Sequence, residues 1–98
     1  MGVVSTQYEA WNRRVVIWHL YVSPGDRGRG IGRRLVETAF EAARAAGARN
    51  AWLETSNLNV PGVRAYERLG FRLCGLDTSL YDGTPAEGEV ALFFCRSL

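Results

Sequence analysis

The sequence predicts a mixed α/β domain with a mostly antiparallel sheet of about five strands and two helices. Three observations support this. Short runs rich in β-branched and aromatic residues alternate with two segments whose apolar residues recur at helical spacing. The last two apolar runs have no helical segment between them, which predicts an antiparallel hairpin. A chain of 98 residues has room for one domain, so we expect a single domain over residues 1–98.

The first half of the chain reads as strand, strand, helix. Val3–Trp11 alternates loosely and can form a strand, and Asn12–Arg14 makes a tight connection to the next strand. The run Val15–Val22 is apolar at almost every position, which is typical of a strand covered on both faces. From Ile31 the apolar residues recur every three or four positions, and we expect Gly47 to close this helix.

The second half reads as strand, helix, strand, strand. Ala51–Thr55 is a short apolar strand, followed by the polar loop Ser56–Asn59. Pro61 suits the first position of a helix, and Gly70 suits its end. The apolar stripe of this short helix consists of Val63, Tyr66 and Leu69.

Phe71–Leu76 and Glu89–Cys95 flank a loop that is rich in glycine and proline, so they predict the closing hairpin. Cys74 and Cys95 lie in these apolar runs without the spacing of a redox or zinc motif. We expect two buried thiols rather than a disulfide, as in a reducing cytosol.

Composition excludes several classes of protein. Hydrophobic residues make up 47% and charged residues 22% of the chain, which excludes a disordered tail. The longest apolar stretch, Val15–Val22, contains His19 and is too short to cross a bilayer. No secretory signal is recognisable, so we expect a cytoplasmic protein without membrane contact. Every basic residue is arginine, which excludes lysine chemistry; codon bias or a phosphate-binding surface would both produce this.

One segment combines glycines with the start of a helix. "PGDRGRGIGRRLVETAF", residues 24–40, turns the chain after a strand and then begins the longer helix. Unpaired amides and the positive dipole at a helix start bind anions, and glycines let a phosphate approach those amides. A glycine-rich turn with a solvated basic rim is the alternative. The basic side chains around it are Arg27, Arg29, Arg33 and Arg34.

Two common phosphate motifs do not fit this segment. A dinucleotide-binding loop needs a third glycine where Arg33 stands, and a nucleoside-triphosphate loop needs a lysine that the chain lacks. What remains is R-x-x-G-x-G, from Arg27 to Gly32.

This motif resembles the acetyl-coenzyme A signature of the GCN5-related N-acetyltransferase (GNAT) family. "NVPGVRAYERLGF", from Asn59 to Phe71, is similar to the family's second signature, and "LYVSPGDRGRGIG" is similar to the strand and loop before the first. The resemblance covers roughly Gly2 to the C-terminus. Within the family, "EAWN", "WLETSNLNVPGVRAYERLGF" and "GLDTSLYDG" look most like the streptothricin acetyltransferase group.

The resemblance implies a site for acetyl-coenzyme A as cosubstrate. The loop and the first helical turn would bind the pyrophosphate, and the backbone at the end of Val15–Val22 would pair with the pantetheine arm. Asn59 would fix the start of the short helix beside the coenzyme, or act as a plain helix cap. The implied coenzyme-binding residues are Leu20, Tyr21, Val22, Arg27, Gly28, Arg29, Gly30, Ile31, Gly32, Arg33, Asn59 and Tyr66.

The resemblance also implies catalytic roles. Tyr66 stands where the family often places the tyrosine that protonates the departing thiolate; a core aromatic is the alternative. Glu54 and His19 are both candidates for the base, and His19 could instead be a packed structural residue. Asp77 and Tyr81 look like acceptor-site residues, with a hairpin turn as the alternative for Asp77. No metal site is predicted.

We therefore expect an N-acetyltransferase domain acting on a primary amine of a small molecule. Streptothricin-like or aminoglycoside-like antibiotics are the candidate acceptors. A catalytically weak coenzyme A-binding regulatory module is the alternative, and nucleic-acid binding is disfavoured because the arginines cluster at one loop without a stacking stripe. Family members usually carry a strand, two helices and another strand before this point. We therefore expect a homodimer or larger oligomer, or else a fragment or a wrongly started gene product.

Overall fold

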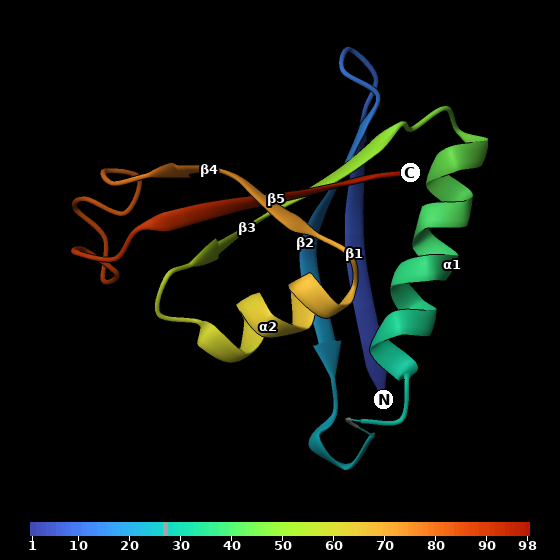
Figure 1. The fold of residues 1–98 in the computed structure, drawn as a ribbon, viewed down its shortest axis with the longest axis horizontal. Helices are drawn as coiled ribbons and strands as arrows, with labels where there is room; N and C mark the ends of the chain where they lie inside the picture. Colours follow the sequence, from blue (N-terminus) through green and yellow to red (C-terminus); the bar gives the residue numbers. More distant parts are fainter. Residues whose placement is uncertain (27) are drawn as a thin grey trace. The chain divides into compact units, whose positions relative to one another are not determined.

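The computed structural model describes residues 1–26 and 28–98, which form two compact units (Figure 1). Residues 1–52 with 97–98 make the first unit, and residues 53–96 make the second. The strands form a five-stranded sheet in the order β1-β2-β3-β5-β4. Together with two helices they give the mixed α/β fold that the sequence predicted.

The observed order of elements matches the predicted order of strands and helices. A short 3-10 helix, η1, precedes α1, and Pro61 occupies the second position of α2 rather than the first. The elements are β1 (Gly2–Glu9), β2 (Arg14–Val22), η1 (Pro24–Asp26), α1 (Ile31–Ala45), β3 (Asn50–Ser56), α2 (Val60–Arg68), β4 (Arg72–Asp77) and β5 (Ala91–Ser97).

In the first unit, β1 and β2 form an antiparallel hairpin, and α1 packs along it (Figure 1). The helix forms because its apolar residues fall on one face, and the buried members of that face are Val36, Phe40 and Ala43. The chain leaves the helix through Gly47, which has a φ of 105°, as the sequence predicted. Gly2 of β1 pairs with Val22 of β2 and lies near Ile31 of the helix, so the N-terminal ends of α1 and β1 lie together at the end of β2.

A β-bulge interrupts the hairpin. Ser5 pairs with His19 while Thr6 pairs with Ile17, so Trp18 is an extra residue on β2. The Trp18 indole donates a hydrogen bond to Gln7 at 3.1 Å and remains 58% exposed, and Tyr21 is 47% exposed. The prediction that Val15–Val22 is covered on both faces is therefore wrong beyond Ile17. The extra residue breaks the alternation of buried and exposed side chains along β2, and Trp18 and Tyr21 remain exposed to solvent.

In the second unit, β4 and β5 form the predicted antiparallel hairpin. Its apolar side chains pack with the end of β3 and with α2 around a small core. The buried members of this core are Leu53, Leu69, Phe71, Ala91 and Phe94. The end of β3, the start of α2 and the loop between β4 and β5 all belong to this unit.

The cysteines depart from the prediction. Cys74 is exposed and Cys95 is half-buried, although neither forms a disulfide. β4 is the last strand of the sheet, and a register shift between Leu73 and Gly75 leaves Cys74 as an extra residue. An apolar sequence run does not by itself reveal that its strand will lie at an edge.

Over residues 1–26 and 28–98, neither helix has the length and apolar character that crossing a bilayer would need.

Candidate functional site

The residues implicated by the sequence fall into two sets, one in each unit. The first unit carries His19, the coenzyme-binding candidates Leu20, Tyr21 and Val22, and the loop from Gly28 to Arg33. The second unit carries Glu54, Asn59, Tyr66, Asp77 and Tyr81. Arg27, the first residue of the R-x-x-G-x-G motif, lies outside the described residues.

The loop before α1 depends on glycine for its backbone shape. Gly28 and Gly30 have φ values of 80° and 76°, in the left-handed region that side chains disfavour. Among the described residues, and leaving aside each glycine's own chain neighbours, a Cβ built at either position would meet no atom within 4 Å. Because the chain itself leaves this space open, the loop can admit a ligand close to its backbone.

The N-terminus of α1 carries no side-chain cap. Gly30 is the N-cap residue, and the first intrahelical hydrogen bond runs from the amide of Arg34 to the carbonyl of Gly30, at 3.0 Å. The first turn of the helix contains no acidic residue. The amides that precede Arg34 have no carbonyl acceptor within the helix. With roughly half a positive charge from the helix dipole, this end attracts an anion.

Arginine side chains surround this helix start. Arg29, Arg33 and Arg34 are all exposed. Arg29 Nη1 lies 3.8 Å from Asp26 Oδ1, an ion pair between exposed groups that contributes little to stability. Phosphate oxygens would compete for these guanidinium groups, which bind them in bidentate geometry.

At the end of β2 the hydrogen-bonding edge that faces β1 is in use, and the opposite edge faces β3 in the sheet. Leu20, Tyr21 and Val22 pair with residues of β1, from Val4 to Gly2. The pairing predicted for the pantetheine arm therefore requires the opposite edge of this strand. His19 is exposed and pairs with Ser5 at the bulge, so the expectation of a packed structural histidine does not hold.

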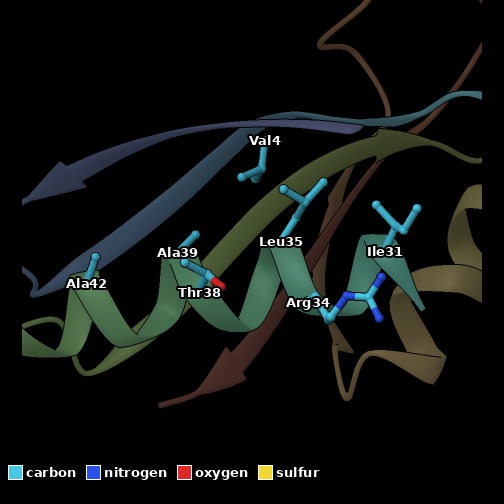
Figure 2. Close-up of a pocket in the computed structure, with 7 residues that line it drawn as sticks. All are labelled: Val4, Ile31, Arg34, Leu35, Thr38, Ala39 and Ala42. Carbon is cyan, nitrogen blue, oxygen red and sulfur yellow. The ribbon is translucent and has the colours of Figure 1, made fainter. Parts of the chain in front are cut away.

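An apolar groove of about 360 Å³ lies between α1 and β1 (Figure 2). Val4 points from β1 towards Leu35 and Ile31 of the helix, and Thr38 lines the groove one turn further on. Apart from Ile31 and Arg34, the groove contains none of the implicated residues, and we assign it to the helix–sheet packing of the first unit.

In the second unit, Asn59 caps α2. Its Oδ1 accepts a hydrogen bond from the amide of Gly62 at 3.2 Å, and its Nδ2 donates to Oγ1 of the buried Thr55 at 3.0 Å. A Cβ at Gly62 would overlap the Asn59 side chain. Asn59 thus performs the cap role that the sequence left open. Sequence reasoning missed Gly62, although the spacing Asn-x-x-Gly places a glycine directly beneath a cap.

Tyr66 lies on α2 against two core aromatics. Its ring meets Phe71 edge-on, with centroids 6.2 Å apart, and is tilted against Phe94 at 6.5 Å. The residue is half-buried, and burial raises the pKa of the Tyr66 phenol. The phenol therefore holds its proton at neutral pH, as a general acid requires. The aromatic contacts also agree with a role in the core.

The structure brings Glu54 and Tyr81 together. The Tyr81 hydroxyl donates a hydrogen bond to Glu54 Oε2 at 2.8 Å. Burial, this hydrogen bond and the charges of Glu54 and Glu89 raise the pKa of Tyr81 to about 12. Sequence reasoning implicated Glu54 and Tyr81 separately and missed Glu89, since no local pattern links residues so far apart in the chain.

Asp77 occupies the turn role that the sequence left as its alternative. Its Oδ1 accepts hydrogen bonds from the amide of Ser79 at 2.8 Å and from the Ser79 hydroxyl at 3.0 Å, and these contacts lower the pKa of Asp77. Across the part of the chain that the structure describes, no group of three or more His, Cys, Asp or Glu could hold a metal ion.

Comparison with known families identifies the glycine loop and helix start. The model of the acetyltransferase (GNAT) family matches residues 1–71, which include both the loop before α1 and the capped helix with Tyr66. The chain belongs to the GNAT family. The resemblance seen in the sequence is therefore confirmed.

Among curated proteins, this GNAT chain is 50% identical over 92 residues to the streptothricin acetyltransferase of Streptomyces lavendulae. That match covers 94% of this chain and 49% of the relative. The streptothricin acetyltransferase of Escherichia coli is 34% identical over 85 residues, covering 86% and 49%. The chain thus spans about half the length of the curated relatives it matches.

Solved GNAT structures agree with this grouping. A nourseothricin acetyltransferase superposes with a TM-score of 0.93 at 49% identity, over 98% of this chain and 56% of that one. An assigned streptothricin acetyltransferase from Bacillus anthracis, solved in complex with acetyl coenzyme A, gives a TM-score of 0.92 at 30% identity. The superposition covers 100% of this chain and 56% of the Bacillus anthracis chain.

Proposed function

We propose that this chain forms the coenzyme-binding part of an acetyl-coenzyme A-dependent N-acetyltransferase whose acceptor is a primary amine of a small molecule. The observation that carries the proposal is the uncapped start of α1 behind Gly28 and Gly30, a site shaped for an anion. Residues 1–98 would then act as a single acetyl-coenzyme A-binding domain.

The proposed coenzyme site uses the backbone more than side chains. The amides from Gly28 to Gly32 would bind the pyrophosphate, with Arg29 and Arg33 adding charge, and the motif assigns Arg27 to the same loop. Leu20–Val22 would bind the pantetheine arm through the edge of β2 that β1 does not use. Asn59 caps α2, the helix that carries Tyr66.

The proposed reaction is direct transfer. The acceptor nitrogen attacks the thioester carbonyl, a backbone amide near Leu20 stabilises the oxyanion, and the carbon–sulfur bond then breaks. Glu54 takes the proton that the acceptor ammonium must lose before attack, and Tyr66 gives its proton to the departing thiolate. The second proton of the attacking nitrogen passes to water, from which Tyr66 regains its own. Glu54 is favoured over His19 because its carboxylate is held by a defined partner, Tyr81.

The acceptor class follows from the relatives. Both curated relatives described above are named as streptothricin acetyltransferases, so we propose a streptothricin-like antibiotic as acceptor and hence a role in antibiotic resistance. Asp77 and Tyr81 were the acceptor-site candidates. Since Ser79 engages one oxygen of Asp77 and Glu54 engages the Tyr81 hydroxyl, any contact with the acceptor must use their remaining surface.

We also propose a cytoplasmic homodimer. β1 is the last strand of the sheet, and Val3, Trp18 and Tyr21 are exposed, so a second copy could cover this edge and face. Light scattering at micromolar concentration tests this proposal, and a well-folded active monomer would contradict it.

Calorimetric titration with coenzyme A, followed by thiol release from acetyl-coenzyme A with a panel of amines, tests the function. The panel contains a streptothricin, an aminoglycoside and simple alkylamines. We expect micromolar binding and thiol release with the streptothricin. Binding without thiol release for any amine would support the regulatory alternative, and absence of binding would contradict both.

A further inference from the structure

The loop between β4 and β5 is tied to the end of β3 by contacts on both of its sides. On its first side, the Tyr81 hydroxyl bonds to Glu54. On its second side, the Ser56 hydroxyl donates to Glu89, and the backbone around Val90 makes two hydrogen bonds with Asn57, both at 2.9 Å. The loop therefore has a fixed position beside the carboxylate of Glu54.

Tyr81 is itself held in place within this loop. Its carbonyl accepts hydrogen bonds from the Thr84 amide at 3.0 Å and from the Thr84 hydroxyl at 2.6 Å. The phenol thus reaches Glu54 from an anchored backbone. A donor fixed in this way restricts the orientation of the carboxylate that it meets.

Glu54 needs such a restraint. It is exposed near the end of β3, and an exposed glutamate otherwise samples many rotamers. Hydrogen bonds to a charged acceptor are stronger than neutral ones, so the 2.8 Å contact selects one orientation. In the described part of the chain this hydrogen bond engages Oε2, which leaves Oε1 to meet a proton donor.

We propose that Tyr81 is a positioning residue, which holds Glu54 in the orientation that removes the proton from the acceptor amine. This inference rests on the proposed function and changes the role of Tyr81, which the sequence had assigned to acceptor binding. The charged groups that face the phenol are Glu54 and Glu89. Because burial, the hydrogen bond to Glu54 and these two charges raise the pKa of Tyr81 to about 12, the phenol stays a donor wherever an amine acceptor reacts.

Kinetics of Tyr81→Phe test the proposal. We expect kcat and kcat/KM to fall about tenfold together, because the carboxylate loses the donor that orients it. The KM for the acceptor should change little. In a Glu54→Gln background the same substitution should have no further effect. A rise in acceptor KM that persists in the Glu54→Gln background would overturn the proposal.

Ser56→Ala is the matched control. It removes the hydrogen bond from Ser56 to Glu89 of the loop, and the one that Ser56 Oγ accepts from the Leu58 amide, and leaves the Tyr81–Glu54 hydrogen bond intact. We expect kcat and kcat/KM within about twofold of the parent. If Ser56→Ala reproduced the fall in kcat of Tyr81→Phe, general support of the loop would explain both results, and the positioning role would be wrong.

A spectroscopic titration of the tyrosines separates this inference from the proposed function. Ultraviolet titration of the 98-residue chain, compared with Tyr81→Phe, isolates the ionisation of Tyr81 without any turnover. Glu54→Gln should lower the pKa of Tyr81, because the negative charge that accepts its hydrogen bond is lost. An unchanged Tyr81 titration in Glu54→Gln would overturn the pairing. Absence of thiol release from the parent, with the titration shifted as expected, would contradict the proposed function alone.

Discussion

The two helices of this chain end alike but begin differently. At the C-terminus of α1, Ala48 and Gly47 donate backbone hydrogen bonds to Ala43 and Arg44. α2 ends in the same way, with Phe71 and Gly70 bonded to Tyr66 and Glu67, and the glycine in each case has a positive φ. Both are the glycine motif that commonly closes helices.

At their N-termini the resemblance disappears. α1 begins at Gly30 with no side-chain cap, whereas α2 begins at Asn59, whose side chain fills the position over the amide of Gly62. A capped start is satisfied by its own chain, and an uncapped one is left for water or a ligand. The difference supports the proposal that α1, rather than α2, binds the anion, and it gives Tyr66 a helix whose start is already capped.

The largest effect is expected at the open helix start. Gly32→Val should weaken coenzyme A binding about 100-fold or more, because a branched side chain obstructs the approach to the first-turn amides. Gly32 has an ordinary helical φ, and a Cβ there would meet only Val22, at 3.5 Å, so the fold should survive. Calorimetric titration measures binding, and circular dichroism checks the fold.

Gly25→Ala is the control for this prediction. Gly25 lies in η1 with no positive φ, and a Cβ there would meet nothing within 4 Å. It should bind coenzyme A like the parent. Retained micromolar binding in a folded Gly32→Val variant would remove α1 from the coenzyme site.

The second effect concerns the chemistry carried by the capped helix. Tyr66→Phe keeps the ring against Phe71 and Phe94 and removes only the hydroxyl. Turnover should fall about 100-fold, while coenzyme affinity and thermal stability change little. Steady-state thiol release and calorimetry measure the two quantities. Unchanged turnover would leave Tyr66 with a packing role only.

The third effect concerns the stability that the Asn59 cap gives to α2. Asn59→Ala should destabilise the chain by about 1 kcal/mol, the usual value of an N-cap, and Asn59→Asp should restore most of it. Gly62→Ala should cost a similar amount, because its Cβ displaces the Asn59 side chain. Urea unfolding measures these changes. If Asn59→Ala also weakened coenzyme A binding tenfold, the two helix starts would share the ligand.

The smallest effect is a pH dependence in the loop of the second unit. Tyr81 titrates at about 12 when folded, above its ordinary value of 10.0. The stability that this shift represents is present below pH 10 and is lost as pH rises towards 12. Tyr81→Phe should flatten the alkaline decline seen in urea unfolding. A decline of equal steepness in the variant would show that other groups cause it.

The sequence predicted the order of elements because each depends on local patterns. The apolar stripe from Ile31 located α1, and Asn59 with Gly70 bracketed α2. The uncapped start of α1 was also predictable, since glycines replace the usual capping residues there. Periodicity and capping act over a few residues, so a single sequence reveals them.

The errors arose where distant strands decide the outcome. The bulge at Trp18 and the edge position of β4 depend on partners that a sequence run does not specify, and so exposed aromatics and Cys74 were expected to be buried. The contact between Tyr81 and Glu54 joins a loop to a strand 27 residues earlier. Only the folded hairpin brings these groups together.

Cys74, an exposed residue of β4, bears directly on how acetyl transfer is measured. Aromatic disulfide reagents that report released coenzyme A also attack any accessible protein thiolate. The protein should therefore give a stoichiometric burst of colour before the first turnover, and a mixed disulfide at β4 would form during the assay. A Cys74→Ser background removes that signal. The native residue, conversely, offers a site for attaching a maleimide dye to the outer strand.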